Sequence, residues 1–503
     1  MSFSGDPAAI LNRLAELRAH DAPTHGGHVL SYVYDSGLSE LDDLAGKAVT
    51  AMQPVNGLDP TTFGSVAVLE RELLGFVREL LHGDPEVVGT VTTGGTESCL
   101  LAVKAARDVW ASGAWAQAHP GTAPRLVAPS TVHAAFHKAA HYLGLALDLV
   151  PVDAGGRVSV EALASRLGDD VALVVVSAPS YPFATLDPVS EVAALCAERD
   201  LALHVDACVG GLVLPFWPTD DGGGGALPPW DFRVPGVTSM SADLHKFGYA
   251  PKGVSVVLQR GRDRQRSQYF ATTRWPGYPV VNPTILGSKS AGPLAAAWAI
   301  VLALGADGFA ELAASMSRST AAVAAEISRI DGLRVVGTPT GPLLAVAADK
   351  SVPGDRRVDP HHWADAAREL GWVLQLQPAL AQDGGIELPP TTHLTITPVT
   401  ERTLPDLLPA LSAAADAVRG QAHVDSSGLL AALPLSDLDA HGLDSDTAWA
   451  LLQGFGIGSG DSSGQGALPS KMAPLLALIE TLPAPIAERL LIELLARLVE
   501  PPA

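Results

Sequence analysis

The stretch Ser241-Ala-Asp-Leu-His-Lys-Phe-Gly-Tyr-Ala-Pro-Lys-Gly253 decides the fold of this chain. About forty residues before its first lysine, Lys246, an apolar run at 201–205 ends in Asp206. Farther upstream, Thr92-Thr-Gly-Gly-Thr-Glu97 is a glycine turn that opens a helical stretch. A lysine placed for a Schiff base, an aspartate at a strand end and a glycine turn that can cradle a phosphate together predict a pyridoxal 5′-phosphate site.

The order of these pieces carries the prediction, because each piece alone has a common structural explanation. Glycine turns are frequent, a lone buried aspartate is usually a cap or a satisfied core carboxylate, and a His-Lys pair is usually solvated surface. Together they place Lys246 at the cofactor, and its neighbour His245 in contact with the cofactor or the substrate.

The residues of this pattern have distinct expected roles. Lys246 would form the Schiff base, with an amine whose pKa is lowered in a cationic, partly desolvated site. Asp206 would pair with the protonated pyridine nitrogen, and His204, on the same face of the strand, would orient Asp206. Backbone N–H groups near Gly95, with the Thr96 hydroxyl, would bind the cofactor phosphate.

Apolar β-branched runs alternate with helical stretches between residues 87 and 258. The runs predict strands at 87–91, 125–128, 147–152, 171–177, 201–205, 237–241 and 254–258, and apolar spacing predicts helices at 133–143, 160–167 and 188–198. This alternation predicts an α/β fold with a mostly parallel central sheet covered on both faces. Because such sheets bind ligands at the carboxyl ends of their strands, Ser177, Asp206 and Lys246 are predicted to line the cofactor site.

The length of 503 residues predicts more than one domain. We expect an N-terminal arm over 1–64, a large cofactor-binding domain over 65–293, a small α+β domain over 294–420 and a helical C-terminal extension over 421–503. The small domain is predicted to have strands at 333–336, 343–347, 372–376 and 393–397, with helices at 294–330, 360–370 and 404–418. A flexible surface insertion is expected at 218–229, and a glycine/serine linker at 454–466 after short helices at 429–453.

A terminal helix is predicted by the apolar stripe of Ile486, Leu490, Leu494 and Leu498. We expect this helix to dock on its own subunit or on a dimer mate, rather than to serve as a tail that binds another protein.

Composition excludes several classes of function. The formal net charge of −21 argues against a nucleic-acid partner, because polyanions require a basic surface. The three cysteines, Cys99, Cys196 and Cys208, lie in or beside apolar segments without metal-ligand spacing, so no metal site is predicted and reduced thiols in a cytoplasmic protein are expected. No signal peptide and no uninterrupted apolar run of about eighteen residues is visible, so no membrane span is expected.

Three motifs resemble one family of enzymes. His133-Ala-Ala-Phe-His-Lys-Ala-Ala140, His204-Val-Asp-Ala-Cys-Val-Gly-Gly211 and the lysine stretch are similar to those of fold-type I pyridoxal-phosphate enzymes, whose fold is that of aspartate aminotransferase. Within this fold, the chain resembles sphingosine-1-phosphate lyase and its bacterial relatives, neighbours of the group II amino-acid decarboxylases. The resemblance runs from about residue 26 to residue 419 and implies pyridoxal 5′-phosphate as the cofactor.

The resemblance also implies roles for individual residues. His133 matches the histidine that stacks on the pyridine ring, and Tyr34 and Tyr181 match active-site tyrosines that contact substrate or transfer protons. Lys252 matches a lysine that binds the substrate phosphate. Gly287-Ser288 matches the segment that reaches the cofactor phosphate of the neighbouring subunit, which implies a homodimer.

Two positions depart from the family pattern. Asp59 replaces a histidine that helps to bind the substrate phosphate, and Lys289 replaces an arginine beside Gly287-Ser288. A carboxylate repels a phosphate dianion and attracts a cation. We therefore expect poor turnover of phosphorylated sphingoid bases and better turnover of non-phosphorylated or cationic amines.

The reaction expected from the resemblance is lyase chemistry at the amine-bearing carbon of a small-molecule amine. Cleavage of a carbon–carbon bond in an amino alcohol or a β-hydroxy amino acid, with release of an aldehyde, is favoured. Loss of carbon dioxide from an α-amino acid is the alternative. An aminotransferase and a cofactor-binding protein without turnover are more distant alternatives. Lys246 or Tyr181 would return the proton to the substrate carbon.

Overall fold

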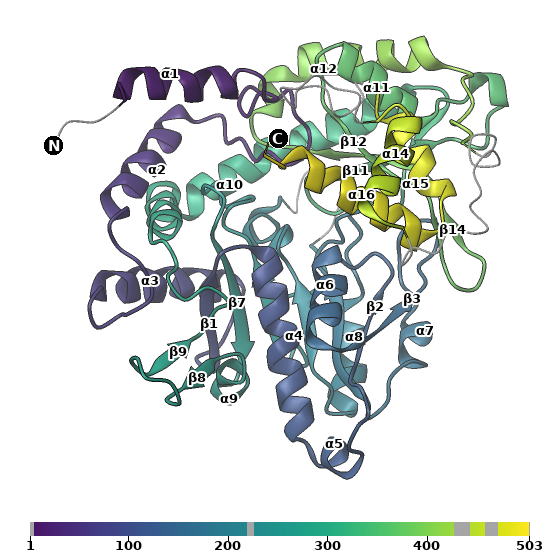
Figure 1. Ribbon diagram of the computed structural model, residues 1–503. Coiled ribbons are helices and arrows are strands. Elements are labelled where there is room, and N and C mark those ends of the chain that lie inside the picture. The colour runs from purple at the N-terminus through teal and green to yellow at the C-terminus, as the bar shows by residue number, and fades with distance from the viewer. Residues whose placement is uncertain (1–4, 219–225, 427–442, 458–470, 502–503) are drawn as a thin grey trace.

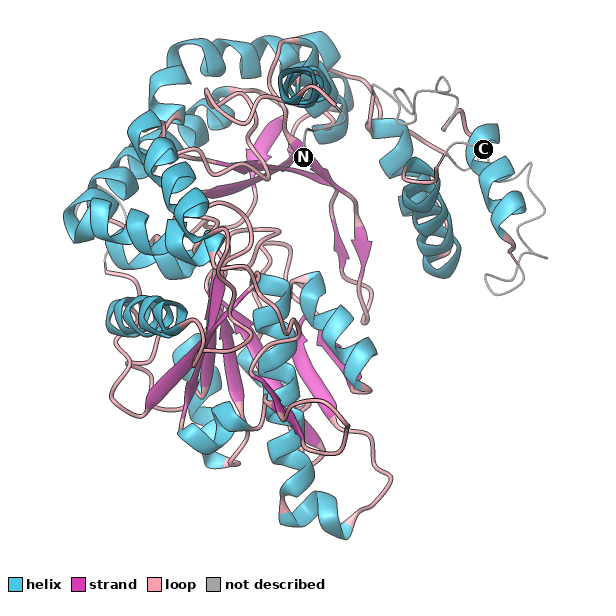
Figure 2. Cartoon of the chain, turned by 60° about the vertical axis from the view of Figure 1, so that its left-hand side comes forward, coloured by secondary structure: helices cyan, strands magenta, loops and turns pink. Residues whose placement is uncertain are grey.

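The computed structural model describes residues 5–218, 226–426, 443–457 and 471–501. It contains a large sheet and a smaller one, with helices around both and a group of helices at the C-terminus (Figures 1 and 2). Most of the expected insertion at 218–229, the first part of the expected helices at 429–453 and most of the expected linker at 454–466 lie outside the described residues.

The helices of the N-terminal part and the large sheet are α1 Pro7–Arg18, α2 Ser39–Met52, α3 Gly64–Leu80, α4 Gly95–Ser112, α5 Ala114–Ala118, α6 Ala134–Leu143, α7 Val160–Ala164, α8 Val189–Glu198 and α9 Arg262–Arg266. Those that follow are α10 Gly292–Arg329, α11 Pro360–Glu369, α12 Thr400–Val418, α14 Ser445–Gly454, α15 Ala473–Thr481 and α16 Ala484–Leu498. Short 3-10 turns lie at Gly210–Leu212, Leu214–Phe216 and Gly354–Arg356.

The strands of the large sheet are β1 Val87–Thr92, β2 Arg125–Pro129, β3 Ala146–Val150, β4 Val171–Ser177, β5 Leu203–Asp206, β6 Ser239–Ala242 and β7 Ser255–Arg260. Their order is β1-β7-β6-β5-β4-β2-β3, and only β7 runs antiparallel to its neighbours. This confirms the expected α/β fold with a mostly parallel sheet.

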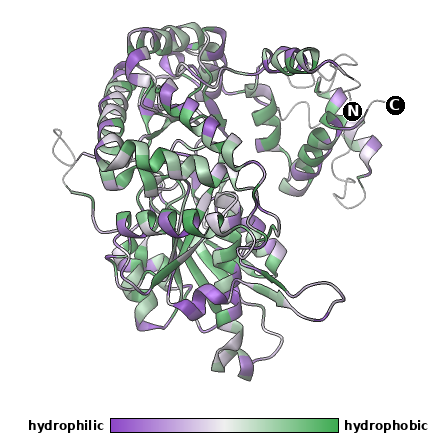
Figure 3. Ribbon diagram, turned by 90° about the vertical axis from the view of Figure 1, so that its left-hand side faces the viewer, coloured by the Kyte–Doolittle hydropathy of each residue, from purple (hydrophilic) through white to green (hydrophobic). Residues whose placement is uncertain are grey.

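Both faces of this sheet are buried, which explains why its strands are apolar throughout. In β4, Leu173 and Val175 pack with residues of α4 and α6, whereas Val174 and Val176 belong to the core on the opposite face. Figure 3 shows the mainly apolar colour of these strands. At about 25 cal/mol per Å² of apolar surface removed from water, two such layers supply the main stabilisation of the sheet.

The smaller sheet has the order β10-β11-β15-β12 and is antiparallel. Its strands are β10 Leu333–Val335, β11 Leu343–Ala348, β12 Gln375–Gln377 and β15 Thr391–Thr395. The strand expected at 372–376 was placed too early, because Val373 instead forms an isolated parallel bridge with Val29 of the N-terminal segment. Two hairpins were not expected: β8 Phe270–Thr272 with β9 Val280–Asn282, and β13 Leu380–Ala381 with β14 Glu387–Leu388.

Helix α10 is the long helix expected after residue 294, with a break at Gly305, whose φ of 56° and ψ of −173° are not helical. Only glycine adopts this conformation without strain. Among the described helices, α10 is long and apolar enough by composition to cross a membrane. It packs against α2 and α12, and Ala296, Ile300 and Val323 are among its buried residues.

The C-terminal helices α14, α15 and α16 form a small apolar cluster of their own, which contains three residues of the expected stripe, Ile486, Leu490 and Leu494. Helix α15 contacts α11 and β12 of the smaller sheet region. The carboxylate of Asp365 in α11 accepts hydrogen bonds from the N–H groups of Met472 and Ala473 at the start of α15 (2.9 Å each). The extension therefore docks on its own subunit.

Candidate active site

A cavity of about 350 Å³ lies where the carboxyl ends of β4 and β5 meet the glycine turn. The sheet register places Ser177, Asp206 and Ser241 side by side on adjacent strands. The residues that line the cavity are Thr93, Gly94, Gly95, Thr96, Glu97, Cys99, His133, Ser177, Pro179, Tyr181, Asp206, Cys208, Val209, Asp243, His245 and Lys246. The structure thus brings together most of the site residues expected from the sequence.

Lys246 follows β6 and forms an ion pair with Asp243, Nζ to Oδ2, at 3.0 Å. Burial disfavours the ammonium, but the negative charge of Asp243, together with smaller contributions from Cys208, Tyr34 and Asp206, raises the pKa of Lys246 well above its usual value. The expectation of a lowered pKa was therefore wrong for the protein without cofactor, because it considered cationic neighbours and omitted an anionic one. Asp243 itself is almost completely buried, and its pKa is lowered: burial opposes the charge, whereas Lys246 and His245 favour it.

Asp206 is held by a relay that runs through Ser241. The Asp206 Oδ1 accepts a hydrogen bond from the Cys208 N–H (3.0 Å) and from the Ser241 hydroxyl (3.3 Å). His204 lies 3.1 Å from the Ser241 hydroxyl through Nε2 and 2.9 Å from the Ser239 hydroxyl through Nδ1. Burial lowers the pKa of His204 to about 4, so its ring is neutral. His204 is fully buried and orients Asp206 through Ser241 rather than directly.

The glycine turn approaches this pair closely. A Cβ on Gly95 would lie 2.6 Å from Asp243 Oδ2 and 3.0 Å from the Cys208 sulfur, so only glycine fits at the start of α4. Glu97 holds the turn: its Oε2 accepts hydrogen bonds from the Thr93 N–H (2.6 Å) and hydroxyl (2.8 Å). Its Oε1 accepts a third bond, from the N–H of Ile285 (2.7 Å). Thr96 is exposed beside this turn.

His133 and Tyr181 also line the cavity, with their rings edge to face at 6.4 Å. His133 caps α6 by accepting a hydrogen bond from the Ala135 N–H, and burial lowers the pKa of its ring. The Tyr181 hydroxyl donates to Gln375 Oε1 (2.6 Å), and its ring stacks on the buried His393 at 4.3 Å. Burial raises the pKa of Tyr181, so this hydroxyl keeps its proton at neutral pH.

His245, Tyr34 and Lys252 form a third group beside the lysine. The His245 Nε2 lies 3.5 Å from Asp243 Oδ2, and its Nδ1 is buried without a hydrogen-bond partner among the described residues. The Tyr34 ring packs edge-on against Phe247, and the Lys252 ammonium lies 4.5 Å above its centre. Burial and the charge of Lys246 lower the pKa of Lys252 to about 8. Lys252 also donates to the His245 carbonyl at 3.3 Å.

The donor set fits pyridoxal 5′-phosphate on observations of this cavity. One carboxylate oxygen of Asp243 and one ring nitrogen of His245 are buried without a partner in the described part of the chain. Gly95 leaves space that a side chain would fill, next to the N-terminus of the 18-residue helix α4. Lys246 could hold the aldehyde carbon, Asp206 the pyridine nitrogen and the helix start the phosphate.

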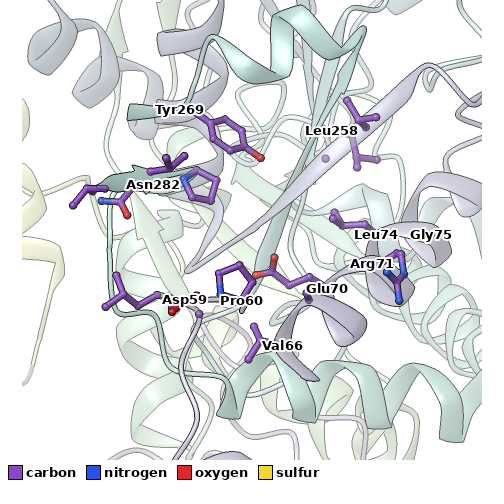
Figure 4. A pocket seen from close by; sticks show the side chains of 18 of the residues that line it. Asp59, Pro60, Val66, Glu70, Arg71, Leu74, Gly75, Leu258, Tyr269 and Asn282 are labelled. Atoms are coloured by element: carbon purple, nitrogen blue, oxygen red, sulfur yellow. The ribbon is translucent and has the colours of Figure 1, made fainter. Parts of the chain in front are cut away.

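Asp59, Gly287 and Ser288 do not line this cavity in their own chain. Asp59 and Gly287 lie near a larger pocket of about 1000 Å³ between α3 and the β8–β9 hairpin, and Asp59 is one of its lining residues (Figure 4). The Asp59 carboxylate accepts hydrogen bonds from the Thr61 N–H and from the hydroxyls of Thr61 and Thr62, which lower its pKa to about 2. Its expected contact with the substrate stays a prediction that requires a second subunit.

Lys289 is bound within its own subunit. Its buried ammonium donates to Glu70 Oε1 (2.7 Å) and to the Val91 carbonyl (2.6 Å). Gly287 and Ser288 lie in the preceding loop, where Ser288 is exposed. In this structure Lys289 anchors that loop to α3 and to the end of β1.

Sequence reasoning missed several residues that build the site. Asp243 lies inside the quoted stretch, but its pairing with Lys246 depends on a turn of three residues. Gln375 comes from the smaller sheet, and its contact with Tyr181 joins residues 194 positions apart. Asp187 is buried and accepts a hydrogen bond from the Ser177 N–H (2.8 Å), and burial raises its pKa to about 7. Buried carboxylates within apolar segments were the available signal.

Comparisons with known proteins agree with this geometry. Residues 25–278 match the family described as the pyridoxal-dependent decarboxylase conserved domain. Residues 427–497 match a second family, the C-terminal putative HTH domain of pyridoxal-dependent enzymes.

Two curated relatives are sphingosine-1-phosphate lyases. That of Dictyostelium discoideum is 38% identical over 314 residues, which are 62% of this chain and 58% of the relative. That of Oryza sativa subsp. japonica is 34% identical over 407 residues, 79% of this chain and 71% of the relative. The chain thus spans between about three fifths and seven tenths of the length of these two relatives.

Solved structures resemble the fold closely. The sphingosine-1-phosphate lyase of Burkholderia pseudomallei is 30% identical with a TM-score of 0.73, over 83% of this chain and 93% of that structure. Glutamate decarboxylase of Lactobacillus brevis has a TM-score of 0.72 at 19% identity, over 84% of this chain and 95% of that structure, which is a similarity of fold alone.

Proposed function

The chain belongs to the pyridoxal-dependent decarboxylase family and is 30–38% identical to three sphingosine-1-phosphate lyases, and we propose that it is a carbon–carbon lyase that releases an aldehyde from a β-hydroxy amine. Pyridoxal 5′-phosphate is the cofactor of this family. The observation that supports the proposal is the cavity that joins Lys246, Asp206 and His133 at the glycine turn. Together with 30% identity over 93% of a bacterial lyase, against 19% for a decarboxylase, it favours aldehyde release over carbon dioxide release.

The cofactor, when bound, withdraws the electron pair of the bond that breaks at the amine-bearing carbon. Asp206 would keep the pyridine nitrogen protonated, and the Ser241–His204 relay fixes the orientation of that carboxylate. Lys246 would provide the amine that carries the cofactor, and the ion pair with Asp243 favours the protonated form of this amine.

Two groups are placed to move substrate protons. His245 presents an unpartnered, buried Nδ1, and its lowered pKa, which results mainly from burial, keeps the ring neutral, so Nδ1 can accept the β-hydroxyl proton. The Tyr181 hydroxyl is held by Gln375 and keeps its proton, so it can return one to the substrate carbon. The sequence left this second role open between Tyr181 and Lys246; the charge state of Tyr181 suits it as a donor.

The test is to incubate the purified protein with β-hydroxy amines and with α-amino acids, and to measure aldehyde and carbon dioxide in parallel. We expect aldehyde from the β-hydroxy amines. Carbon dioxide without aldehyde would make the protein a decarboxylase and overturn the proposed reaction.

A homodimer is part of the proposal. Large apolar side chains are exposed on α1 and on the segment around the β8–β9 hairpin: Ile10, Leu11, Leu14, Leu17, Phe270, Trp275, Tyr278, Val281, Ile285 and Leu286. Such surface supports association with a second copy, and the exposed loop with Gly287 and Ser288 would then reach the site of the partner. A molar mass of one chain in solution would contradict this.

The remaining expectations concern environment and other partners. Residues 427–497 contain eight Asp or Glu against three Lys or Arg, which supports the absence of a nucleic-acid partner even though they match a putative HTH domain.

We propose a cytoplasmic location without a membrane span, supported by the free, buried thiols of Cys99, Cys196 and Cys208 and by the packing of α10 on α2 and α12.

A further inference from the structure

A cluster of two histidines and two carboxylates lies where the C-terminal helices dock on the smaller sheet region. His361 lies in the first turn of α11, His423 follows α12, and Glu480 belongs to α15. One potential ligand atom of each of these three residues lies within 4.8 Å of the other two. The fourth residue, Asp359, is the N-cap of α11.

His361 is oriented as a metal-binding histidine would be. Its side chain is fully buried, and its Nε2 lies 2.8 Å from the carbonyl of Gln377 in β12, to which it can only donate. The neutral ring therefore presents a lone pair on Nδ1. That Nδ1 is buried without a partner among the described residues. Histidines that bind metals typically donate their other ring N–H to a carbonyl or carboxylate in this way.

His423 shows the same arrangement with a carboxylate. Its Nδ1 lies 2.6 Å from Asp359 Oδ2, and its Nε2 lies 2.7 Å from Glu480 Oε2. The other oxygen of Glu480 accepts a hydrogen bond from the Ala379 N–H (2.7 Å), and Asp359 accepts two from the N–H groups of His361 and His362. Backbone donors thus position both carboxylates before any ion binds, and His423 Nε2 and Glu480 Oε2 would move apart slightly to accept an ion between them.

We propose that His361 Nδ1, His423 Nε2 and Glu480 Oε2 bind one divalent transition-metal ion, Zn²⁺ in the first instance. Two imidazoles and one carboxylate form a ligand set that zinc uses in proteins, with a fourth position left for water. Asp359 is a positioning residue, because it touches the ring of His423 and not the ion. The ion would replace the proton that His423 and Glu480 share.

The site would fasten the C-terminal helices to the rest of the subunit. Glu480 comes from α15, whereas His361 and Asp359 belong to the smaller sheet region, so one ion would join two parts that meet where α15 contacts α11 and β12. This role is separate from the proposed reaction, because these residues are not among those that line the cavity of Lys246.

The experiment uses the full-length holoenzyme, freed of metal with a chelator and then titrated with Zn²⁺ against a chromophoric competitor. We expect one zinc per chain at this site, and at least a tenfold weaker affinity in His361→Gln and Glu480→Gln. Asp359→Asn should weaken binding by ~10–100-fold, as loss of a ligand-orienting partner does. His362→Gln is the matched control, because His362 is adjacent in α11 and, among the described residues, its ring hydrogen-bonds to the Ala422 carbonyl rather than to the cluster.

A second measurement locates the ion. Hydrogen exchange in 473–481 should slow when zinc is added to wild type and to His362→Gln, and should not change in His361→Gln. Cofactor absorbance equal to wild type confirms that each variant is folded. Zinc bound equally by wild type and His361→Gln, or no zinc bound by wild type, would overturn the site and leave His423 as a proton-bridged ion pair. Neither result would affect the proposed lyase activity.

Discussion

The two pockets of the large sheet region differ in whether their polar groups have hydrogen-bond partners. The first residues of β1, Val87 to Gly89, line the larger pocket, and the glycine turn after the same strand lines the smaller one. In the larger pocket the Asp59 carboxylate has three hydrogen bonds from its own neighbours. In the smaller one Asp243 and His245 each keep a buried atom without a partner among the described residues. The smaller pocket is therefore the one whose lining includes buried polar atoms without partners among the described residues, although its volume is smaller.

Replacing Lys246 tests this comparison with the largest expected effect. We expect Lys246→Ala to abolish the visible absorbance of the covalently held cofactor and to lower aldehyde release by at least ~10³-fold, because Lys246 is the only lysine among the described residues that line the smaller pocket. Borohydride reduction followed by mass analysis of peptides checks the attachment. Cofactor fixed to the variant at another residue would move the reactive site away from this pocket.

Replacing Asp243 tests the smaller pocket further, because the charge of this carboxylate influences the protonation state of Lys246. The carboxylate raises the pKa of Lys246, so Asp243→Asn should lower the pH midpoint of cofactor attachment by about 1–3 units. More of the amine is then neutral, and able to attack the cofactor aldehyde, at pH 7. Absorbance of the metal-free apoprotein titrated with cofactor at a series of pH values measures the midpoint. An unchanged midpoint would mean that the ion pair does not control the lysine.

Lys252 tests whether the smaller pocket extends toward an anionic substrate. Its pKa of about 8 makes it cationic below pH 8 and neutral above. If it binds the head group, KM for a phosphorylated amine should rise by up to about tenfold per pH unit above pH 8, and should not change for a non-phosphorylated amine. Lys252→Met should raise KM for the phosphorylated amine by ~10-fold at pH 7 and remove the pH dependence of that KM. Equal pH profiles for both substrates would exclude this role.

Asp59 gives the smallest expected effect, since it lies in the other pocket. Asp59→His should raise kcat/KM for a phosphorylated amine by about threefold to tenfold in the dimer. The substitution removes the repulsion between the Asp59 carboxylate and the substrate phosphate, which would act over about 4 Å or more. Activity on the non-phosphorylated amine is the internal control. A wild type that already prefers the phosphorylated substrate, with no change in Asp59→His, would show that this carboxylate plays no part in recognition.

The sequence predicted well those parts of the site and fold whose position follows from one residue and its place in a strand or helix. Ser177 and Asp206 end β4 and β5, as expected from their positions after apolar runs, and the parallel sheet follows from strands buried on both faces. The helix that opens at Gly95 was also located correctly.

The parts missed depend on contacts between distant segments. The pKa of Lys246 was assigned the wrong direction, because Asp243 was not recognised as its partner. β12 was placed early, because Val373 pairs with Val29, far away in the chain. The histidine cluster has no motif, since its members come from α11, the segment after α12, and α15. Periodicity describes a segment and its neighbours, and it contains no information about such pairs.

The hydrogen bonds of Glu97 have a consequence for how the enzyme would behave on dilution. This one carboxylate binds Thr93 in the glycine turn and Ile285 in the loop that leads to Gly287 and Ser288. In the proposed dimer, cofactor binding at one site and association of the second subunit would therefore both depend on the position of Glu97. Linkage is reciprocal: if association tightens cofactor retention by some factor, the cofactor tightens association by the same factor. A stock diluted toward its dissociation constant should lose both together, so the fraction of loaded enzyme depends on its own concentration.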